Sequence, residues 1–285
     1  MVMKLFNKVT IIGVGLIGGS IGLAIKKKGL AKEVTGVFRR ASTMKRALRR
    51  KAIDKGSLNI EEGTRNADLI IIAAPVRAIP SLAEKAFEYA KRGAIITDAG
   101  STKRWIVERV ERRLGGRRSA FFVGSHPMAG SEQAGVESAS ADLLGNAPCI
   151  VTKTAATDKA ALRKIVRFWS SLGANVSVMT PGEHDERVSF ISHLPHLIAF
   201  SVAGAVPERF LRYAAEGFRD TTRVASSDPE LWADIFLTNK KEILKSARKF
   251  EKFYRKLLKA LRDDNHQAVV KLLAAAKAKR DKFKL

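Results

Sequence analysis

A glycine-rich turn near the N-terminus constrains the fold of this chain more than any other feature. The apolar run at residues 9–12 leads directly into GVGLIGGS at residues 13–20, and a helical pattern follows. In such a strand–turn–helix unit the first glycine permits a sharp turn, the second lets a phosphate pair approach bare backbone, and the third lets the helix pack close to the strand. An ordinary strand-to-helix turn is the alternative, but a second strand pattern at residues 33–38 favours a dinucleotide site. The residues of this turn predicted to bind the cofactor are Gly13, Gly15, Leu16, Ile17 and Gly18.

The residues after the second predicted strand favour NADP over NAD. A chain that binds the ribose hydroxyls of NAD usually carries an acidic residue about 20 positions beyond the glycines. Phe38 occupies that place here, and Arg39, Arg40 and Ser42 follow it. Two guanidinium groups and a hydroxyl suit a ribose 2′-phosphate. The alternative is that both arginines are solvated charges at the start of a helix.

Apolar, often β-branched runs alternate with helical segments through the first 180 residues. They occur at residues 9–14, 34–38, 68–74, 93–98, 120–124, 148–152 and 175–179. This alternation predicts a mostly parallel sheet covered by helices on both faces, hence an α/β Rossmann-type N-terminal domain over residues 1–180. Beyond residue 180 the pattern is helical, so we expect an all-α C-terminal domain over residues 181–285. The stretch 191–206 is too apolar for a solvent-facing helix, and we expect it to be buried and to pair two subunits as a homodimer.

The net charge of +24 raises nucleic-acid binding as a competing function. The basic residues are spread over many helical faces, however, and form no single arm or stripe. The sequence also lacks a zinc-ligand set, an aromatic RNA-binding signature and an obvious helix-turn-helix. We therefore expect no specific nucleic-acid partner, and a surface that attracts anionic small molecules is the favoured interpretation.

The single cysteine, Cys149, rules out an internal disulfide framework and indicates a reducing compartment. No uninterrupted apolar run approaches the roughly 18 residues of a membrane span. The N-terminus has no apolar signal segment with a cleavage site. We expect a cytoplasmic protein that does not associate with membranes.

Three segments, which contain in order residues 74–76, Ser101 and His126, each follow the predicted carboxyl end of a strand. An open α/β sheet places its catalytic and binding residues at these ends. The second segment contains Ser101 and Thr102, either of which could cap a helix. The third contains His126, and a lone histidine after a strand is more often a structural hydrogen-bonding residue than a catalyst. The first has small residues and a proline that would let a nicotinamide lie against backbone, namely Ala74, Pro75 and Val76.

His193 and His196 share one helix face at a spacing of three residues, which could place both on a metal ion. The sequence offers no convincing third and fourth ligand, so we expect no metal site. Pro195 lies between them and should disturb the helix, because proline lacks an N–H and leaves a carbonyl free. A free carbonyl suits the wall of a pocket.

Several motifs occur in order along nearly the whole chain, and together they resemble the prephenate and arogenate dehydrogenase family of tyrosine biosynthesis. They are residues 13–20, 98–103 (DAGSTK), 125–130 (SHPMAG), 192–196 (SHLPH), 217–223 (GFRDTTR) and 227–232 (SDPELW). The resemblance implies an oxidative decarboxylation in which hydride leaves C4 of a cyclohexadienyl ring for NAD(P)+, carbon dioxide leaves C1, and the ring becomes aromatic.

The resemblance also implies roles for single residues. His126 matches the catalytic histidine, and a neutral imidazole with a pKa near 6.5 can accept the C4 hydroxyl proton. Ser101 matches a serine that holds this hydroxyl and orients the histidine. Arg223 matches the arginine that binds a substrate carboxylate, a task for a bidentate fork. His196 matches a histidine that faces the substrate.

The remaining substrate-binding residues expected from the resemblance are Ser125, Trp232, Glu132 and Asp220. Trp232 would line or support the pocket, although a tryptophan in a helical core is the simpler interpretation. Glu132 and Asp220 could pair with Arg223 or gate the pocket. A carboxylate beside the substrate would favour the ammonium group of arogenate over the keto group of prephenate, and the sequence leaves the choice between these substrates open.

Two other functions remain as alternatives. One is another hydroxy-acid dehydrogenase with the same two-domain plan, which would oxidise a 3-hydroxy acid and not a cyclohexadienyl substrate. The other is a non-enzymatic protein that binds NADP and nucleic acid through its basic faces, with an affinity that salt weakens and that does not need His126.

Overall fold

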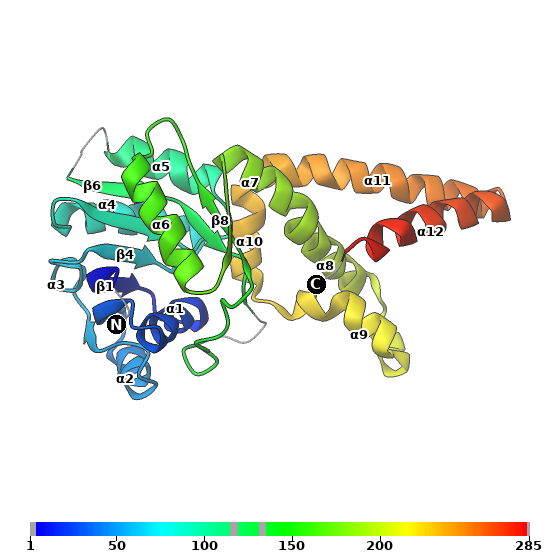
Figure 1. Cartoon of the computed structure of the whole chain (residues 1–285). Coiled ribbons are helices and arrows are strands. Elements are labelled where there is room, and N and C mark those ends of the chain that lie inside the picture. The colour runs from blue at the N-terminus through cyan, green and yellow to red at the C-terminus, as the bar shows by residue number, and fades with distance from the viewer. Residues whose placement is uncertain (1–3, 115–118, 131–134, 284–285) are drawn as a thin grey trace. The chain divides into compact units, whose positions relative to one another are not determined.

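The computed structural model describes residues 4–114, 119–130 and 135–283 (Figure 1). The chain forms two compact units, which divide after Asn239. The first unit contains two sheets, the helices that cover them and a series of further helices. The second unit, from Lys240 onward, is helical.

A six-stranded parallel sheet forms the centre of the first unit, in the order β3-β2-β1-β4-β5-β6. This order confirms the Rossmann-type fold. The strands β2 and β3 lie on one side of β1, and β4 is added on its other side. The strand order therefore reverses between β1 and β4, and such sheets bind ligands at this switch point. The strands are β1 (Phe6–Ile12), β2 (Ala31–Val37), β3 (Lys55–Ser57), β4 (Leu69–Ile72), β5 (Ala94–Asp98) and β6 (Ala120–Val123).

Helices cover both faces of this sheet because its central strands are apolar on both faces. On β4, Leu69 and Ile71 belong to one buried cluster with residues of α1 and α6, whereas Ile70 and Ile72 belong to a second cluster with residues of α4 and α5. The helices of this region are α1 (Leu16–Lys27), α2 (Ala41–Arg49), α3 (Ile60–Thr64), α4 (Ile79–Tyr89), α5 (Arg104–Leu114) and α6 (Lys159–Ser171).

A second sheet corrects the expectation that all strands join one sheet. It consists of β7 (Ser125–Pro127), β8 (Pro148–Thr152) and β9 (Asn175–Met179), with β7 antiparallel to β8 and β8 parallel to β9. The chain changes sheets at Gly124, which accepts a hydrogen bond from the amide of Thr152. A Cβ atom at Gly124 would lie 2.6 Å from Thr152 Oγ1, so the absence of a side chain lets the two segments approach. This change of sheet puts His126 on a strand of its own.

The rest of the first unit is helical, and its first long helical stretch is irregular. A π-helical turn at Ser189–His193 joins α7 (Pro181–Val188) to α8 (Leu194–Ala205). The turn ends two residues before Pro195, which cannot donate the regular helical hydrogen bond. The remaining elements are a 3₁₀ turn (Glu208–Tyr213), α9 (Glu216–Thr222), a 3₁₀ turn (Arg223–Ser226) and α10 (Pro229–Thr238).

The expectation that residues 191–206 are buried is wrong for a single chain. Ile191 is 65% exposed, and within α8 only Leu194 and Ala199 are buried. Among the described residues, Pro181–Ala205 is also the one helical stretch that is long and apolar enough, by length and composition, to cross a membrane. This stretch contains no uninterrupted apolar run of membrane-spanning length, but its mean hydropathy is high despite its polar positions. Such a stretch is weak evidence for a membrane, because an apolar helix of a soluble protein has the same composition.

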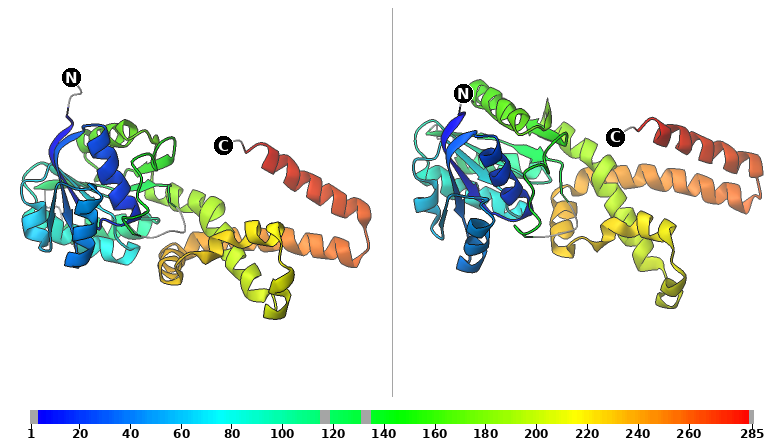
Figure 2. Two further views of the ribbon diagram at one scale, coloured as in Figure 1. Left: turned by 90° about the horizontal axis from the view of Figure 1, so that it is seen from below. Right: turned by 60° about the horizontal axis from the view of Figure 1, so that its bottom comes forward.

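The second unit consists of α11 (Lys240–Arg262) and α12 (His266–Asp281), two helices that are joined by a short turn and contact each other (Figure 2). The helical pattern predicted beyond residue 180 is therefore confirmed for this unit. Several aromatic and aliphatic side chains of this unit are exposed, among them Phe250, Tyr254, Leu261 and Leu273.

Candidate active site

A cleft of about 710 Å³ opens where the carboxyl ends of β1, β4 and β5 meet the helices that follow residue 180. It brings together most of the residues predicted from the sequence. Those that line it are Gly15, Leu16, Ile17, Gly18, Ala74, Pro75, Val76, Ser101, His126, His196, Arg223 and Trp232.

The glycine turn has the geometry that a dinucleotide pyrophosphate requires. Gly13 has a φ of +89°, and a Cβ there would lie 2.3 Å from the carbonyl oxygen of Ala73. A Cβ at Gly18 would lie 2.1 Å from the carbonyl oxygen of Gly13, so α1 packs closely against the turn. At Gly15 a Cβ would meet nothing within 4 Å. The turn therefore leaves open space at the N-terminus of α1, whose first turn contains no acidic residue.

Arg39, Arg40 and Ser42 are exposed at the end of β2 and the start of α2, and they do not line the cleft as it stands. Phe38 is buried, and its ring would lie 2.6 Å from a Cβ at Gly36. The side chain at the position of the usual ribose-binding acid thus packs into the core, and only the residues after it face solvent.

His126 lies in the middle of β7, is 8% exposed and lines the cleft. Its Nδ1 is 2.8 Å from Nε2 of His184, a residue on α7. Burial lowers the pKa of His126 well below its ordinary value of 6.5, and the nearby His184, Lys103 and His193 lower it further. The imidazole is therefore neutral at pH 7 and able to accept a proton.

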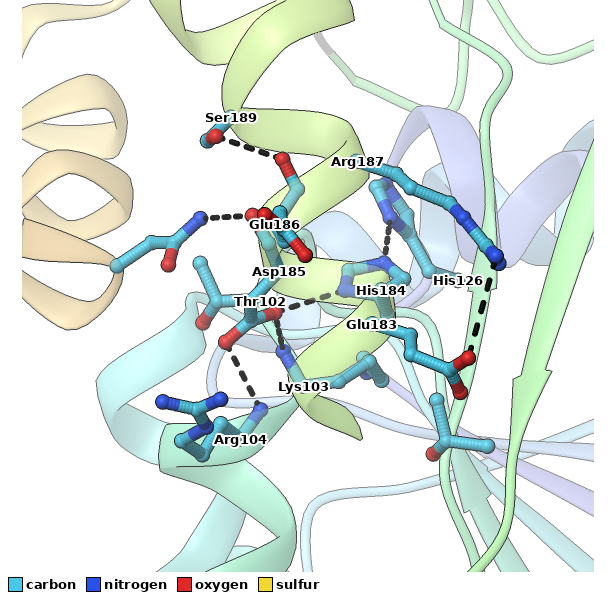
Figure 3. Close-up of polar contacts among 12 residues, drawn as sticks. Thr102, Lys103, Arg104, His126, Glu183, His184, Asp185, Glu186, Arg187 and Ser189 are labelled. Atoms are coloured by element: carbon cyan, nitrogen blue, oxygen red, sulfur yellow. Dashed lines mark hydrogen bonds and ion pairs between the residues drawn. The ribbon is translucent and has the colours of Figure 1, made fainter. Parts of the chain in front are cut away.

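His184 is in turn hydrogen-bonded to Asp185, with 2.7 Å between Nδ1 and Oδ1 (Figure 3). Asp185 also accepts the backbone N–H groups of Lys103 and Arg104, at 2.7 and 3.0 Å, and so caps the first amides of α5. The predicted capping residue Ser101 lies instead on the cleft wall. A continuous chain of hydrogen bonds thus runs from α5 through α7 to the histidine on β7.

Ser125 lies behind the cleft wall, fully buried, and its hydroxyl is 2.8 Å from the hydroxyl of Thr97. Its carbonyl accepts a 2.7 Å hydrogen bond from the ammonium of Lys103, which also pairs with Asp98. The amide of Ser125 donates to the same carboxylate. This buried network fixes the backbone on which His126 stands, and the structure does not bring the Ser125 hydroxyl to the cleft.

His196 forms the opposite side of the cleft with Trp232. The two rings are stacked, with centroids 3.6 Å apart and planes inclined by 21°. His196 Nδ1 is 2.8 Å from the carbonyl oxygen of Ser192 in the π-helical turn, which leaves Nε2 for other partners. Burial lowers the pKa of His196, the Ser192 carbonyl raises it, and the guanidinium of Arg223 lowers it. Trp232 is 7% exposed and both lines the cleft and packs in a core cluster.

Of the two acidic candidates the structure describes only Asp220, and it does not bring this residue together with those of the cleft. Arg223 begins the 3₁₀ turn after α9 and lines the cleft. Asp220 is exposed on α9 and does not line it. Glu132 lies outside the described residues. Within the described chain, no group of three His, Cys, Asp or Glu residues could hold a metal ion.

His184 and Asp185 are not among the site residues predicted from the sequence, because the helical pattern beyond residue 180 does not distinguish them from their neighbours. A local signal was available. Thr180 and Glu183 form a capping box at the start of α7, and a His-Asp pair directly after such a cap lies in the first turn of a helix. The partner on β7 is 58 residues away in the sequence, so only the fold shows what the pair contacts.

Two family models match the chain. The model described as prephenate dehydrogenase, nucleotide-binding domain, matches residues 21–178, and the model described as prephenate dehydrogenase, dimerization domain, matches residues 180–275. The compact units divide at residue 239 instead, so the domain boundary at residue 180 stays a prediction.

Named relatives are similar over most of the chain. Prephenate dehydrogenase of Bacillus subtilis (strain 168) is 39% identical over 245 residues, which are 84% of this chain and 66% of that protein. Cyclohexadienyl dehydrogenase of Zymomonas mobilis is 34% identical over 252 residues, which are 85% and 84% of the two chains. The chain thus spans about two thirds of the length of the B. subtilis protein and most of the length of the Z. mobilis protein.

Solved structures are similar as well. Prephenate dehydrogenase from A. aeolicus, in complex with hydroxyphenyl propionate and NAD+, superimposes with a TM-score of 0.90 at 33% identity and covers 98% of both chains. Arogenate dehydrogenase of Synechocystis superimposes with a TM-score of 0.82 at 28% identity, over 97% of this chain and 100% of that one.

Proposed function

The chain belongs to the prephenate dehydrogenase family, and from this membership we infer that it oxidises prephenate to 4-hydroxyphenylpyruvate, with loss of carbon dioxide, in tyrosine biosynthesis. The observation that carries the proposal is that His126 lines the same cleft as the glycine turn, His196 and Arg223. A base, an anion-binding group and a dinucleotide turn are the parts that this reaction needs.

The proposed mechanism assigns the proton to His126. Its Nδ1 is occupied by His184, so Nε2 is the nitrogen that accepts the proton of the C4 hydroxyl. Ser101, on the same wall, holds that hydroxyl and orients it. A nicotinamide bound over Ala74, Pro75 and Val76 would supply the hydride acceptor.

Arg223 and His196 bind the other end of the substrate in this proposal. The guanidinium of Arg223 pairs with a substrate carboxylate in two-point fashion. His196 donates or accepts through Nε2, held in place by the Trp232 ring. Ser125 supports the wall from behind, while Glu132 and Asp220 are proposed to act near Arg223. Arogenate is the second candidate substrate, because a relative of 28% identity is an arogenate dehydrogenase.

We propose NADP+ as the preferred cofactor, with its 2′-phosphate near Arg39, Arg40 and Ser42. The support is chemical: no acidic residue follows β2, the aromatic side chain at position 38 is buried, and both guanidinium groups are exposed. NAD+ is the alternative, since it is the cofactor in the A. aeolicus complex.

We further propose a cytoplasmic homodimer. The support for the dimer is the match of residues 180–275 to a dimerization domain and the exposed apolar residues of the same region. The support for the compartment is the single cysteine, which is buried and unpaired.

Rates with prephenate and arogenate, each with NAD+ and NADP+, test the activity and both specificities. We expect turnover of prephenate with NADP+ to have the highest kcat/KM. In His126→Asn, kcat should fall by about 100-fold or more, because a positioned general base contributes about that factor, while cofactor affinity stays unchanged. His266→Asn, at an exposed position on α12, is the matched control. Oxidation of neither substrate, or full turnover in His126→Asn, would contradict the proposal.

The cofactor assignment has its own test. Arg39→Asp combined with Arg40→Ala should shift the ratio of kcat/KM values toward NAD+ by about tenfold or more, because one or two charge-assisted phosphate contacts of about 1.5–3 kcal/mol are lost. Lys45→Asp combined with Arg49→Ala makes the same charge change further along α2. An unchanged ratio in the first variant, or an equal shift in the control, means that the loop does not bind the 2′-phosphate.

A further inference from the structure

We propose that His184 and Asp185 are positioning residues that hold His126 in one tautomer, with its proton on Nδ1 and its Nε2 lone pair directed to the cleft. The role of that lone pair, which is to accept the substrate proton, rests on the proposed function. The geometry of the hydrogen-bond chain does not depend on it.

Asp185 begins the chain as an acceptor. It is 2% exposed, and its carboxylate accepts the backbone N–H groups of Lys103 and Arg104 and lies 2.7 Å from Nδ1 of His184. The two N–H groups belong to the N-terminal end of α5, where the helix dipole favours a negative charge. Burial raises the pKa of Asp185, whereas the two backbone N–H groups lower it. Burial is the largest of these effects, and the net pKa of Asp185 is raised. Backbone N–H groups nevertheless reach both carboxylate oxygens, and such donors favour the charged form, so the proposal places the negative charge on Asp185.

The ionised carboxylate determines the tautomer of His184. Because Asp185 can only accept, Nδ1 of His184 must carry the proton that it donates across 2.7 Å. Burial lowers the pKa of His184 well below 6.5, and the charge of Lys103 lowers it further, so the ring carries no second proton. Its Nε2 is therefore a lone-pair acceptor.

The tautomer of His184 then determines that of His126. Only a donor can share the 2.8 Å contact with Nε2 of His184, so Nδ1 of His126 carries the proton. In a neutral ring Nε2 is then the unprotonated nitrogen. The two rings meet edge to face with centroids 5.1 Å apart, which fixes the orientation as well as the protonation.

The other charged groups around His126 do not interrupt this chain. The ammonium of Lys103 is bound by Asp98 and the carbonyl oxygen of Ser125, not by the imidazole. His193, whose pKa burial lowers to about 4, makes a 3.1 Å contact with the side chain of Asn239. The imidazole of His184 is thus the hydrogen-bonding partner assigned to Nδ1 of His126.

Two substitutions of His184 separate positioning from simple packing. In His184→Gln the amide oxygen can take the place of Nε2 and accept the proton of His126, whereas His184→Leu offers no acceptor. Glutamine keeps an acceptor oxygen at this position and leucine keeps no polar group, so the two variants differ in whether Nδ1 of His126 retains an acceptor. We expect kcat to fall about 100-fold in His184→Leu, the low end of a general-base contribution, and less than tenfold in His184→Gln, with KM unchanged in both. Equal losses of kcat in the two variants would overturn the proposal.

Histidine ¹⁵N chemical shifts give a readout that needs no turnover. In the wild-type protein at pH 7.5, His126 should show a protonated Nδ1 and an unprotonated Nε2. In Asp185→Asn the amide can donate to His184, which allows both rings to reverse, and the shifts of His126 should move toward the opposite tautomer. Unchanged shifts in Asp185→Asn, or a protonated Nε2 in the wild type, would overturn the positioning role. Absence of dehydrogenase activity with a protonated Nδ1 would instead overturn the proposed function alone.

The pH profile of kcat/KM adds an independent comparison. His184→Gln removes one of the groups that lower the pKa of His126, so the acidic limb of its profile should move to higher pH than in the wild type. His193 also lowers the pKa of His126, but by less than His184 does, so the acidic limb should move less in His193→Asn than in His184→Gln. A shift of the limb in His193→Asn but not in His184→Gln would contradict the proposed chain.

Discussion

Three buried histidines, His126, His184 and His193, give this protein a dependence on pH that follows from their burial. Burial lowers the pKa of each below 6.5, well below it for the first two and to about 4 for the third. In the unfolded chain all three have pKa values near 6.5. Between pH 6.5 and the folded values, the unfolded chain therefore binds more protons than the folded one.

We accordingly predict that the free energy of unfolding falls as the pH drops below 6.5. Above pH 6.5 these histidines add no pH dependence to it. Each histidine contributes about 1.4 kcal/mol per pH unit in that window. Urea unfolding at pH 7.5, 6.5 and 5.5 measures the slope. His193→Asn should reduce the slope by about one histidine's share, and a slope equal to that of the wild type would show that His193 titrates normally in the folded protein.

At the scale of single elements, α7 depends on its cap. The Thr180 hydroxyl accepts a hydrogen bond from the amide of Glu183. The Glu183 carboxylate accepts hydrogen bonds from the amide and the hydroxyl of Thr180. Because this helix carries His184 in its first turn, fraying at its start would move the partner of His126. The cap therefore links local stability to the position of the base.

We predict that Thr180→Ala lowers the free energy of unfolding by about 1 kcal/mol, the usual value of an N-cap, and lowers kcat as well. Ser170→Ala removes a hydroxyl from an exposed position of α6 and should change neither quantity. Urea unfolding and steady-state kinetics on the two variants test this. Loss of stability with unchanged kcat would show that the first turn of α7 keeps its place without the cap.

Local patterns in the sequence predicted most of these elements, because strand, glycine turn and helix signals act over a few residues. They failed where pairing is decided at long range. The pattern at residues 148–152 predicts a strand, but one of the two neighbours of that strand is β7, which becomes available only because the chain bends at Gly124. The three residues of β3 include a glycine and form no apolar run. Likewise His126 was predicted from its motif, whereas the contact with His184 spans 58 residues.

At the scale of the whole molecule, the helices beyond residue 180 leave apolar side chains uncovered. Phe250 is 39% exposed and Tyr254 is 48% exposed, and their rings stack on one face of α11. The region matched by the dimerization-domain model includes both. An aromatic pair in water is unfavourable for a lone chain and favourable for one that covers it with a second copy.

We predict that Phe250→Glu combined with Tyr254→Glu converts a dimer into a monomer, as measured by sedimentation equilibrium at micromolar concentration. Leu48→Glu combined with Leu58→Glu introduces the same charges at exposed apolar positions of the sheet-containing unit and should leave the dimer intact. A dimer that survives the first change, or a wild-type chain that sediments as a monomer, would show that this face of α11 does not join two subunits.

The stacking of Trp232 on His196 gives the cleft a built-in optical signal. The other two indoles lie elsewhere: Trp169 is fully buried, and Trp105 lies beneath the guanidinium of Arg109. An imidazole in face-to-face contact quenches indole fluorescence, and more strongly when it is protonated. Any ligand that displaces this imidazole or changes its charge therefore alters the emission of one tryptophan in three. Occupancy of the cleft can be titrated in a cuvette, before any reaction takes place.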